Sequence, residues 1–565
     1  MRQLIECVPN ISEGRDRVVI DRVVAEIEKV EGVRLLDVDP GQTTNRTVIT
    51  FVGEPEPVVE AAFRVVARAA ELIDMGSHHG AHPRQGATDV CPLVPVAGIT
   101  MEEVVGYARH LGERIGTELG IPVFCYEEAA FRPERRNLAY CRTGEYESLC
   151  RRLGTEEWKP DFGPNEWNAA TARTGATQVG ARDFLVAINY NLNTTSTRRA
   201  NAVAFDVREK GRPLREGGKL TGKPVKDADG NVVMVPGTLK GTKAIGWYIE
   251  DYGIAQVSMN ITSIKTAPVH LCFEEVCRCA RERGLRVTGC EIVGLIPKSV
   301  LIDAGRFYLR RQRRSLGVSE AEVVKVAVKS MGLDDLKPFD PKEKVIEYMI
   351  DGDGTRRLVD LSCRGFCDET ASESPAPGGG SVSAYMGALA ASLGTMVANL
   401  TGGKAAYDEQ WERYSEVAER GQHLKEELLR AVDDDTEAFN RIMAAFALPK
   451  STDSERAARS EAIQQATRHA TEVPFRTMQL ALDTFGVCRD MVEWGNPASV
   501  TDGGVGALAA RAAVLGAHLN VKINAASLKD EAFRTGILAR AAAIESEALR
   551  QEAEILTLVN QKIGL

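Results

Sequence analysis

The chain has 565 residues, a formal net charge of −9 and 44% hydrophobic residues. This length suits three or four domains, because single domains usually hold roughly 100 to 200 residues. The acidic balance gives no overall attraction to nucleic acid or to an anionic membrane, so we expect small-molecule substrates. Twelve cysteines without a Cys-x-x-Cys pair argue against structural zinc and a disulfide framework, and the N-terminal sequence lacks a leader pattern, which predicts a cytoplasmic protein.

Strand and helix patterns alternate over the first 350 residues, which is typical of an α/β fold. We expect strands at 33–39, 47–52, 184–192 and 254–261, helices at 16–30, 56–73, 101–119 and 269–284, and a short or edge strand at 89–96 because of its prolines.

The alternation restarts at Phe184 after the irregular, glycine-rich segment 161–180. We therefore predict two subdomains, 1–184 and 185–350, with a cleft between them. Residues 209–243 are rich in Gly, Lys and Pro, and contain the hairpin signal Asp229-Gly230, so they are interpreted as an insertion in the second subdomain.

Long helical patterns with few strand signals follow a polar linker at 351–358. They predict an all-α helical bundle over 359–565. Residues 381–403 carry no charge, but their Ala, Gly, Ser, Thr and Asn content favours a tightly packed soluble helix over a membrane span.

Three of the eight histidines lie in the segment 78–84. Imidazole can take a proton from an amine and return it to a leaving group near neutral pH. The histidines could instead bind a metal ion or pack as hydrogen-bonded structural residues. A metal site is the weaker interpretation, because no carboxylate or cysteine at ligand spacing lies close by in the sequence. His82 is the candidate base, and the neighbouring Arg84 is a fixed cation suited to an anionic group.

The segment 175–182 superficially resembles a phosphate loop. It lacks the Lys-Ser/Thr ending and leads into a strand, so a nucleotide site is a poor interpretation. The glycine-rich loop with Trp167 is better suited to wrapping a flat ligand by stacking and backbone hydrogen bonds, and a structural linker between the subdomains is the alternative.

One carboxylate stands out in the helical half. The apolar residues at spacings of three and four around Asp435 are Leu424, Leu428, Val432, Phe439, Ile442 and Phe446. This stripe predicts that Asp435 faces the core, where its pKa is perturbed, whereas Asp433, Asp434 and Glu437 fall on a solvated face. A buried structural ion pair explains the pattern about as well.

Two glycine-rich segments, 374–382 and 495–504, each open a helix and can present free N–H groups to an anion or a carbonyl oxygen. Close helix packing is the alternative explanation for each glycine.

Together these residues closely resemble the bifunctional formiminotransferase-cyclodeaminase family of histidine degradation and folate metabolism. The resemblance spans nearly the whole chain. Its motifs are 6–14, 36–39, 44–47, His82-Pro-Arg84, 161–164 and 246–248 in the first half, and 376–382, 433–439 and Asn520-Val-Lys-Ile-Asn524 in the second.

The resemblance implies two ferredoxin-like α/β subdomains with a folate cleft, followed by a helical bundle that dimerises. It implies His82 as transferase base, Asp435 as cyclodeaminase acid, tetrahydrofolate as co-substrate, no metal, and a homo-oligomer acting on formiminoglutamate and folates with or without polyglutamate tails. The substrate-binding residues it implies, with the patterns above, are Asp39, Arg84, Gly163, Pro164, Thr174, Gly175, Gly378, Gly379, Gly380, Ser381, Asn496 and Asp502.

Two alternatives stay open. The helical half also resembles stand-alone methenyltetrahydrofolate cyclohydrolases, which use water instead of expelling ammonia. A non-catalytic folate-binding scaffold would explain the glycine loops but leave His82 and Asp435 without a role. Oligomer size, polyglutamate preference, channelling between sites and the role of the insertion are not encoded in these patterns.

Overall fold

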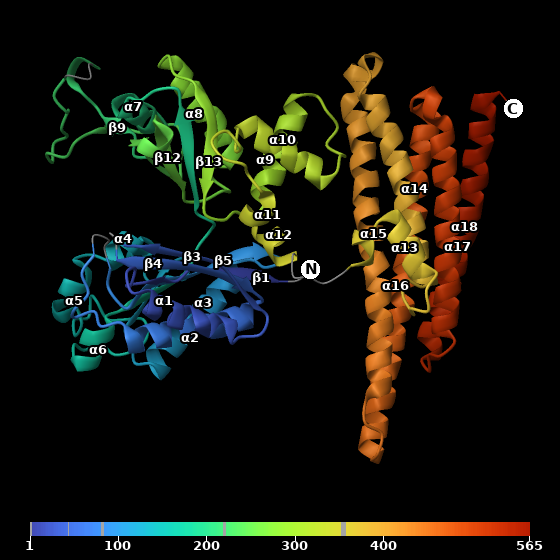
Figure 1. The fold of residues 1–565 in the computed structure, drawn as a ribbon, viewed down its shortest axis with the longest axis horizontal. Helices are drawn as coiled ribbons and strands as arrows, with labels where there is room; N and C mark the ends of the chain where they lie inside the picture. The colour runs from blue at the N-terminus through green and yellow to red at the C-terminus, as the bar shows by residue number, and fades with distance from the viewer. Residues whose placement is uncertain (1–2, 43–44, 81–83, 219–221, 352–356, 565) are drawn as a thin grey trace. The chain divides into compact units, whose positions relative to one another are not determined.

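The computed structural model describes residues 3–42, 45–80, 84–218, 222–351 and 357–564 (Figure 1). The chain forms two compact units. The first holds Met1–Val300 with Met331–Asp353, and the second holds Leu301–Ser330 with Gly354–Leu565. The predicted class, an α/β part followed by an all-helical part, is confirmed.

The first unit begins with a seven-stranded sheet. Its strands are β1 (Leu4–Cys7), β2 (Asn10–Ile11), β3 (Val33–Gly41), β4 (Arg46–Gly53), β5 (Thr88–Ala97), β6 (Val123–Glu127) and β7 (Thr177–Ala181). Strand β3 pairs with β4, which pairs with β1 and β2; both of these pair with β5, and β7 lies between β5 and β6. The β5–β7–β6 pairings are parallel and the others antiparallel.

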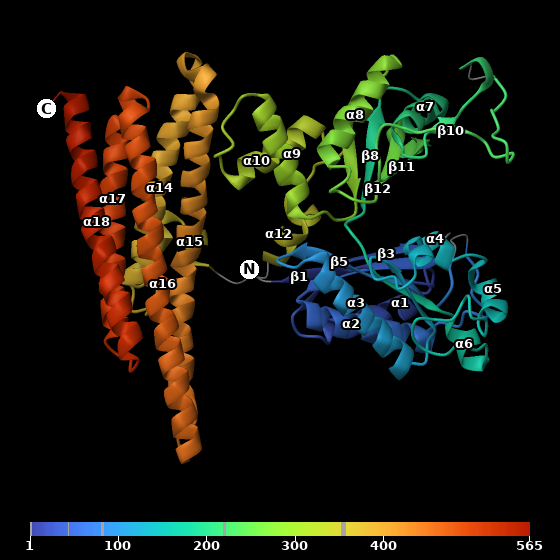
Figure 2. The same cartoon turned by 180° about the vertical axis from the view of Figure 1, so that it is seen from behind.

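Three helices cover one face of this sheet: α1 (Arg17–Glu28), α2 (Pro55–Leu72) and α3 (Met101–Glu118). Figures 1 and 2 show them side by side beneath it. Apolar residues recur along α2 at spacings of three and four residues, from Val58 to Ala69, and the face that they form is buried. The order β1-α1-β3-β4-α2-β5, with β1 between β4 and β5, is a ferredoxin-like core. The elements from α3 to β7 extend it.

Strand β5 is central, so the prediction of an edge strand was wrong. Proline removes a ladder donor, which normally excludes it from interior strands. Here Pro92 lies where pairing passes from β2 to β1, and its carbonyl accepts a hydrogen bond from Val8 N at 3.2 Å. Pro95 lies beyond the part of β5 that pairs with β7. Each proline therefore pairs with one neighbouring strand, Pro92 with Gly180 and Pro95 with Ile5, and lies where the pairing on the other side changes strand or has ended.

Several short elements were not predicted. Strands β6 and β7 are buried on both faces and show no alternation of polar and apolar residues. Between them lie α4 (Leu138–Cys141), α5 (Glu145–Arg152) and α6 (Ala169–Thr174). Helix α6 and nearly all of strand β7 lie inside the segment that we interpreted as irregular.

The second subdomain repeats the same order of elements. It comprises β8 (Val186–Leu192), α7 (Thr197–Val207), β11 (Thr242–Ile249), β12 (Ile254–Ile261), α8 (Val269–Glu282) and β13 (Val287–Val293), in an antiparallel sheet of order β11-β12-β8-β13. The insertion between α7 and β11 carries the short strands β9 (Arg212–Pro213) and β10 (Met234–Val235). Its turn falls at the predicted place, because Asp227 Oδ1 accepts hydrogen bonds from Asp229 N and Asn231 N.

Apolar residues of both subdomains share a small buried cluster. Val52 and Val94 come from the first sheet, and Phe184 comes from the segment that joins the subdomains. Ile346 of α12 (Ile346–Asp351) completes the buried set. A polar contact lies nearby in sequence, where Ser263 Oγ donates to Asp183 Oδ2 at 2.9 Å.

The second unit is a bundle. Its helices are α13 (Cys363–Thr370), α14 (Gly379–Gly402), α15 (Trp411–Ala447), α16 (Asp453–Trp494), α17 (Val500–Ala525) and α18 (Glu531–Ile563). The α15–α16 hairpin extends past the ends of the other long helices (Figure 2). Residues 301–330, from α9 (Lys298–Arg311) and α10 (Glu320–Met331), belong to this unit by contact. There Leu316 N donates to Ser415 Oγ at 2.9 Å.

Small residues let the long helices approach closely. A methyl group at Gly394 would lie 2.7 Å from the Val487 side chain, and one at Gly516 would lie 2.4 Å from Ser383 Oγ. Helix α14 and the segment Pro497–Ala525 are long and apolar enough to cross a membrane by length and composition alone. Both pack against other helices of the bundle, and the core helix of a soluble protein meets the same criterion.

Candidate active sites

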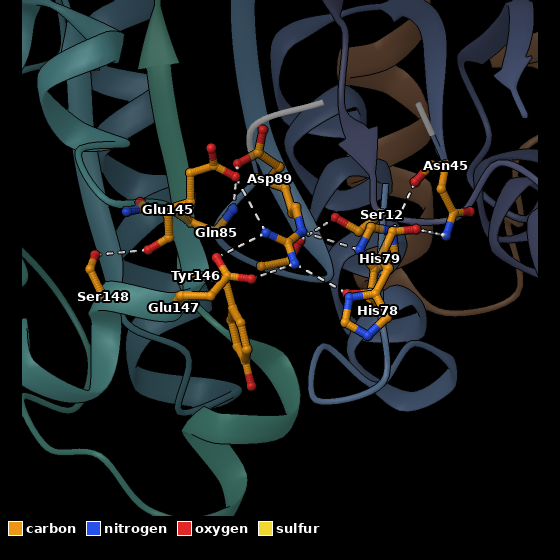
Figure 3. A network of polar contacts seen from close by, with 12 residues as sticks. Ser12, Asn45, His78, His79, Gln85, Asp89, Glu145, Tyr146, Glu147 and Ser148 are labelled. Atoms are coloured by element: carbon orange, nitrogen blue, oxygen red, sulfur yellow. Dashed lines mark hydrogen bonds and ion pairs between the residues drawn. The ribbon is translucent and has the colours of Figure 1, made fainter. Parts of the chain in front are cut away.

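The histidine segment is fixed at both of its ends. His82 lies in 81–83, outside the described residues. On one side, Asn45 Nδ2 donates to the His79 carbonyl oxygen at 3.0 Å. On the other side, Tyr146 N donates to the Arg84 carbonyl oxygen at 2.9 Å. Figure 3 shows His78, His79 and Asn45 on one side of this network and Glu145, Tyr146 and Glu147 on the other.

The tautomer of His78 follows from its partners. Arg84 Nε donates to His78 Nδ1 at 3.3 Å, so Nδ1 carries no proton. The proton is on Nε2, which donates to the Asn45 carbonyl oxygen at 2.9 Å. Burial lowers the pKa of His78, with the Arg84 charge acting in the same direction and the bond to Asn45 opposing them. A neutral imidazole in this position is a structural residue.

Arg84 is held by carboxylates. Its guanidinium forms a two-bond ion pair with Glu147 at 2.8 and 3.0 Å and contacts Glu145 at 3.3 Å. The hydrogen bonds that Arg84 donates to Glu147 keep the pKa of Arg84 above its usual value. Only 9% of the side chain is exposed. The cation is therefore already paired, and an anionic ligand must compete with Glu147 for it.

A pocket of about 700 Å³ lies beside this network. Both subdomains line it, because Lys243 comes from β11 and Arg84 from the loop between α2 and β5. Arg142 also lines it and forms an ion pair with Asp89, whose Oδ1 accepts a hydrogen bond from Gln85 N at 3.0 Å. The other lining residues are Asn137, Leu138, Ala139, Gly144, Glu145 and Glu147. Sequence patterns gave no signal for Arg142 or Lys243.

The second site centres on Asp435 of α15. Ser381, at the start of α14, donates to Asp435 Oδ2 from its backbone N at 2.9 Å and from its Oγ at 3.1 Å. A methyl group at Gly380 would lie 2.1 Å from Asp435 Oδ1. Only glycine at position 380 leaves space for the Asp435 carboxylate, and the N-terminus of α14 binds one of the two carboxylate oxygens.

The environment of Asp435 raises its pKa. Burial is the main cause, and the two hydrogen bonds from Ser381 oppose it. Since Oδ2 already accepts both bonds, Oδ1 is the oxygen left to exchange a proton. A carboxyl group with a raised pKa is suited to general acid–base chemistry nearer neutrality.

The Asp435 pocket has a volume of about 140 Å³. It brings together the predicted residues Gly378, Gly379, Gly380 and Asp435. Its remaining lining comes from several helices and the segment before α14: Pro375, Ala376, Thr436, Ala438, Phe439, Ile442, Ala470, Asn520 and Asn524. Asn520 and Asn524 were not predicted as site residues, although their spacing of four places them on one face of a helix.

Comparisons with known proteins cover both units. Family models match residues 4–182 (Formiminotransferase domain, N-terminal subdomain), 187–351 (Formiminotransferase domain) and 362–543 (Formiminotransferase-cyclodeaminase). The chain is 41% identical over 563 residues to formimidoyltransferase-cyclodeaminase of Gallus gallus, which covers 100% of both chains. It belongs to the formimidoyltransferase-cyclodeaminase family.

Single-function relatives match the two halves separately. Glutamate formimidoyltransferase of Streptococcus pyogenes is 42% identical over 310 residues, covering 55% of this chain and 94% of the relative. Methenyltetrahydrofolate cyclohydrolase of Methylorubrum extorquens is 38% identical over 199 residues, covering 35% of this chain and 96% of the relative. The chain is thus a bifunctional formimidoyltransferase-cyclodeaminase, with a transferase half and a cyclodeaminase half.

Gly163, Pro164, Thr174 and Gly175, which were predicted to bind substrate, do not line the pocket at Arg84. Gly163 has a φ of +83° and packs against the Ile121 carbonyl, and Gly175 has a φ of +67° and packs against the Gln85 carbonyl. Their left-handed backbone accounts for glycine at both positions. Pro164 follows Gly163, and Thr174 Oγ1 donates to the Ala170 carbonyl at 3.2 Å. Their part in folate binding stays a prediction.

Asp161, from the same motif, has a structural role. It pairs with Arg135 at 2.7 Å, and its second oxygen accepts a hydrogen bond from Cys125 N at 2.8 Å. Both side chains are buried. Asp39 is exposed near the end of β3, opposite Val48, and does not line the Arg84 pocket either. Its role also stays a prediction.

In the cyclodeaminase half, Asn496 and Asp502 lie apart from the Asp435 pocket. Asn496 N donates to Thr401 Oγ1, at the far end of α14 from Ser381. Twenty residues of helix at about 1.5 Å each separate these two positions by roughly 30 Å. Asp502 follows in the first turn of α17. The structure therefore does not bring these two residues to the predicted site.

Two expectations about α15 need correction. Asp433 is not simply solvated, because it accepts a hydrogen bond from Leu358 N at 2.8 Å and so anchors the segment that enters the bundle. Phe439 and Phe446 are 37% and 50% exposed, although the stripe predicted them in the core. Helix α14 begins beside Asp435, so α15 beyond that point lies past the end of its neighbour (Figure 1).

No three His, Cys, Asp or Glu side chains gather closely enough to hold a metal ion in the part of the chain that the structure describes. That neither activity needs a metal stays a prediction.

Proposed function

We propose that the transferase half moves the formimino group of N-formimino-L-glutamate to N5 of tetrahydrofolate, with His82 as the base. N5 attacks the formimino carbon, His82 takes the N5 proton, and the carbon–nitrogen bond to glutamate breaks as the departing amine receives a proton. Two features support this. His79 and Arg84, the described residues nearest His82 that accept these bonds, are held by Asn45 and Tyr146, and Arg84 lines a pocket of about 700 Å³ that has room for a substrate.

The cyclodeaminase half then closes 5-formiminotetrahydrofolate to 5,10-methenyltetrahydrofolate. N10 forms a bond to the formimino carbon, Asp435 Oδ1 accepts the N10 proton and passes it to the terminal nitrogen, and ammonia leaves. The observation that carries this proposal is the Asp435 carboxyl group itself. Ser381 donates hydrogen bonds to one oxygen, burial raises the pKa of the carboxyl group, and Asp435 lines a pocket.

A second candidate for the helical half is hydrolysis of 5,10-methenyltetrahydrofolate. The match to a stand-alone methenyltetrahydrofolate cyclohydrolase supports it, because that relative covers only this half. We favour ammonia release because the relatives that match nearly the whole chain are named formimidoyltransferase-cyclodeaminase. A non-catalytic scaffold is not consistent with membership of this enzyme family.

We also propose a homo-oligomer. Large apolar side chains are exposed on three helices of the bundle: Leu389, Met396, Leu400, Phe439, Met443, Phe446, Val505, Leu508, Leu519 and Ile523. Exposed apolar residues in such number usually mark an interface. Sedimentation of the purified chain should give a mass above that of the monomer.

The test assigns one activity to each site. His82→Ala should abolish glutamate release from formiminoglutamate, since a general base contributes about 10² to 10⁴-fold in rate, and should leave ammonia release from supplied 5-formiminotetrahydrofolate intact. Asp435→Asn should do the reverse. Asp434→Asn is the matched control, because Asp434 lies exposed next to Asp435 and does not line the pocket. Loss of both activities in either folded variant would contradict separate sites.

A further inference from the structure

Lys243 lines the Arg84 pocket from the second subdomain. Neighbouring residues of strand β11 alternate in burial, so that Ala244 and Gly246 are buried and Lys243 is exposed on the opposite face of the strand. The buried face packs against α7, because a methyl group at Gly246 would lie 2.2 Å from Asn201 N. Lys243 is therefore on the face of β11 that is turned away from α7, and it borders a pocket whose other walls come from the first subdomain.

The two other cations that line this pocket already have partners. Arg84 is paired with Glu147 and Glu145, and Arg142 is paired with Asp89. A substrate anion that bound either guanidinium would have to displace a carboxylate of the protein, and a buried cation that loses its partner destabilises the fold. Neither arginine is therefore well suited to exchange anions in each catalytic cycle.

The helix end that lines the pocket has no spare donor either. Helix α5 begins at Glu145, whose N donates to the Arg142 carbonyl oxygen at 2.9 Å, and Tyr146 N donates to the Arg84 carbonyl oxygen at 2.9 Å. The Glu147 carboxylate accepts a hydrogen bond from its own main chain. The first turn of α5 is therefore already occupied, and an anion in the pocket needs a different cation.

Lys243 is the remaining cation of this pocket. It forms no salt bridge with any residue that the structure describes. Its charge acts on the first sheet, because burial raises the pKa of Glu127, at the end of β6, and the charges of Arg182 and Lys243 oppose that rise. An ammonium group carries three N–H donors, so Lys243 can bind a carboxylate without displacing one.

Both substrates of the proposed transfer carry carboxylates, at different distances from the reaction. In N-formimino-L-glutamate, one carboxylate is attached to the same carbon atom as the reacting nitrogen. In tetrahydrofolate, the carboxylates belong to the glutamyl tail, at the opposite end of the molecule from N5. Arg84, which lines the pocket, is close in sequence to His82, the proposed base. A cation of this pocket is therefore placed for the carboxylate of the formimino donor.

We propose that Lys243 binds a carboxylate of the formimino donor and thereby selects acidic donors for the transferase. This inference rests on the proposed transferase function of the pocket. Because Lys243 belongs to the second subdomain and the other lining residues belong to the first, the donor site is complete only where both subdomains contribute. Lys243 takes no part in the proton transfers, so its role is in binding and not in the chemical step.

The experiment measures glutamate release by the full-length chain, with each substrate varied in turn while the other is saturating. In Lys243→Gln, the KM for formiminoglutamate should rise about tenfold or more, because a hydrogen bond to a charged group is lost, whereas kcat and the KM for tetrahydrofolate stay at the wild-type values. Lys243→Arg keeps the charge and should restore most of the affinity. Added salt should raise the KM for formiminoglutamate more steeply in wild type than in Lys243→Gln, because salt screens exposed charges.

Lys240→Gln is the matched control, because Lys240 is exposed just before β11 and does not line the pocket. Ammonia release from supplied 5-formiminotetrahydrofolate monitors folding of each variant.

Three outcomes in Lys243→Gln would overturn the inference. A higher KM for tetrahydrofolate alone would mean that the lysine binds the glutamyl tail of folate. A lower kcat with both KM values unchanged would place Lys243 in the chemical step, and unchanged constants would leave it without a role. If the wild-type chain released no glutamate from formiminoglutamate, the proposed function and this inference would fail together, whereas the three outcomes above, with glutamate release intact in the wild type, overturn the inference alone.

Discussion

Gly380→Ala should disable the cyclodeaminase site without adding or removing any polar group. The new methyl group would lie 2.1 Å from Asp435 Oδ1 and 2.6 Å from Oδ2, whereas ordinary contacts begin at 3.4 Å. The carboxylate must therefore retreat by more than about 1 Å, away from the two donors of Ser381. A displacement of this size costs about 10²-fold in rate at a reacting centre.

The assay is ammonia release from 5-formiminotetrahydrofolate, with glutamate release from formiminoglutamate as an internal reference. We expect the first rate to fall about 10²-fold and the second to stay at the wild-type value. Gly486→Ala is the matched control in the same bundle, because a methyl group there meets no atom within 4 Å. If Gly380→Ala released ammonia within about threefold of wild type, the position of Asp435 would not control the reaction.

Three further predictions concern the transferase half. Gly175→Ala forces a methyl group to 2.1 Å from the Gln85 carbonyl at a φ of +67°, so it should lower the denaturation midpoint and the transferase rate together; an unchanged midpoint would contradict the packing argument. Asp161→Asn leaves the buried Arg135 charge without its partner and should cost about 3–5 kcal/mol in urea unfolding, and a loss below about 1 kcal/mol would refute a buried pair. His78 has a pKa below 6.5 when folded, so the folded state binds fewer protons than the unfolded one. Its contribution is complete above that value and is lost as the pH falls below it, so wild type should lose stability more steeply than His78→Gln below about pH 6.5; parallel profiles would show that His78 is not responsible.

Helical periodicity predicted the direction of Asp435 well. The stripe through Leu428 and Val432 fixes which side of α15 packs, and Asp435 indeed meets the start of α14. Periodicity could not predict how far along α15 the packing against α14 extends, because that depends on where α14 begins. Phe439 and Phe446 continue the apolar pattern of α15 but lie beyond the start of α14 and are exposed.

In the α/β half, too, some elements were predicted from the sequence and others were missed. Long amphipathic elements such as α2 and β12 were predicted within a residue or two, because one face of each is buried. Strands β6 and β7 were missed, because strands buried on both faces lose the alternation that identifies them. Site residues such as Lys243 depend on how two subdomains close over one pocket, and a local pattern carries no information about that.

The close spacing of the bundle helices affects how sequence variation in this family should be interpreted. Gly394 and Gly516 are required because a neighbouring side chain fills the space that a methyl group would need, and neither lines the Asp435 pocket. Gly380 is required for an equally short approach, but its neighbour is the carboxylate of Asp435, the proposed cyclodeaminase acid. Helix spacing and chemistry would thus each select glycine, and the identity of the residue alone does not tell the two causes apart. A ranking by conservation would therefore mix positions that are required for helix packing with positions that are required for catalysis. Only measured rates of the two activities in glycine variants would separate the two groups.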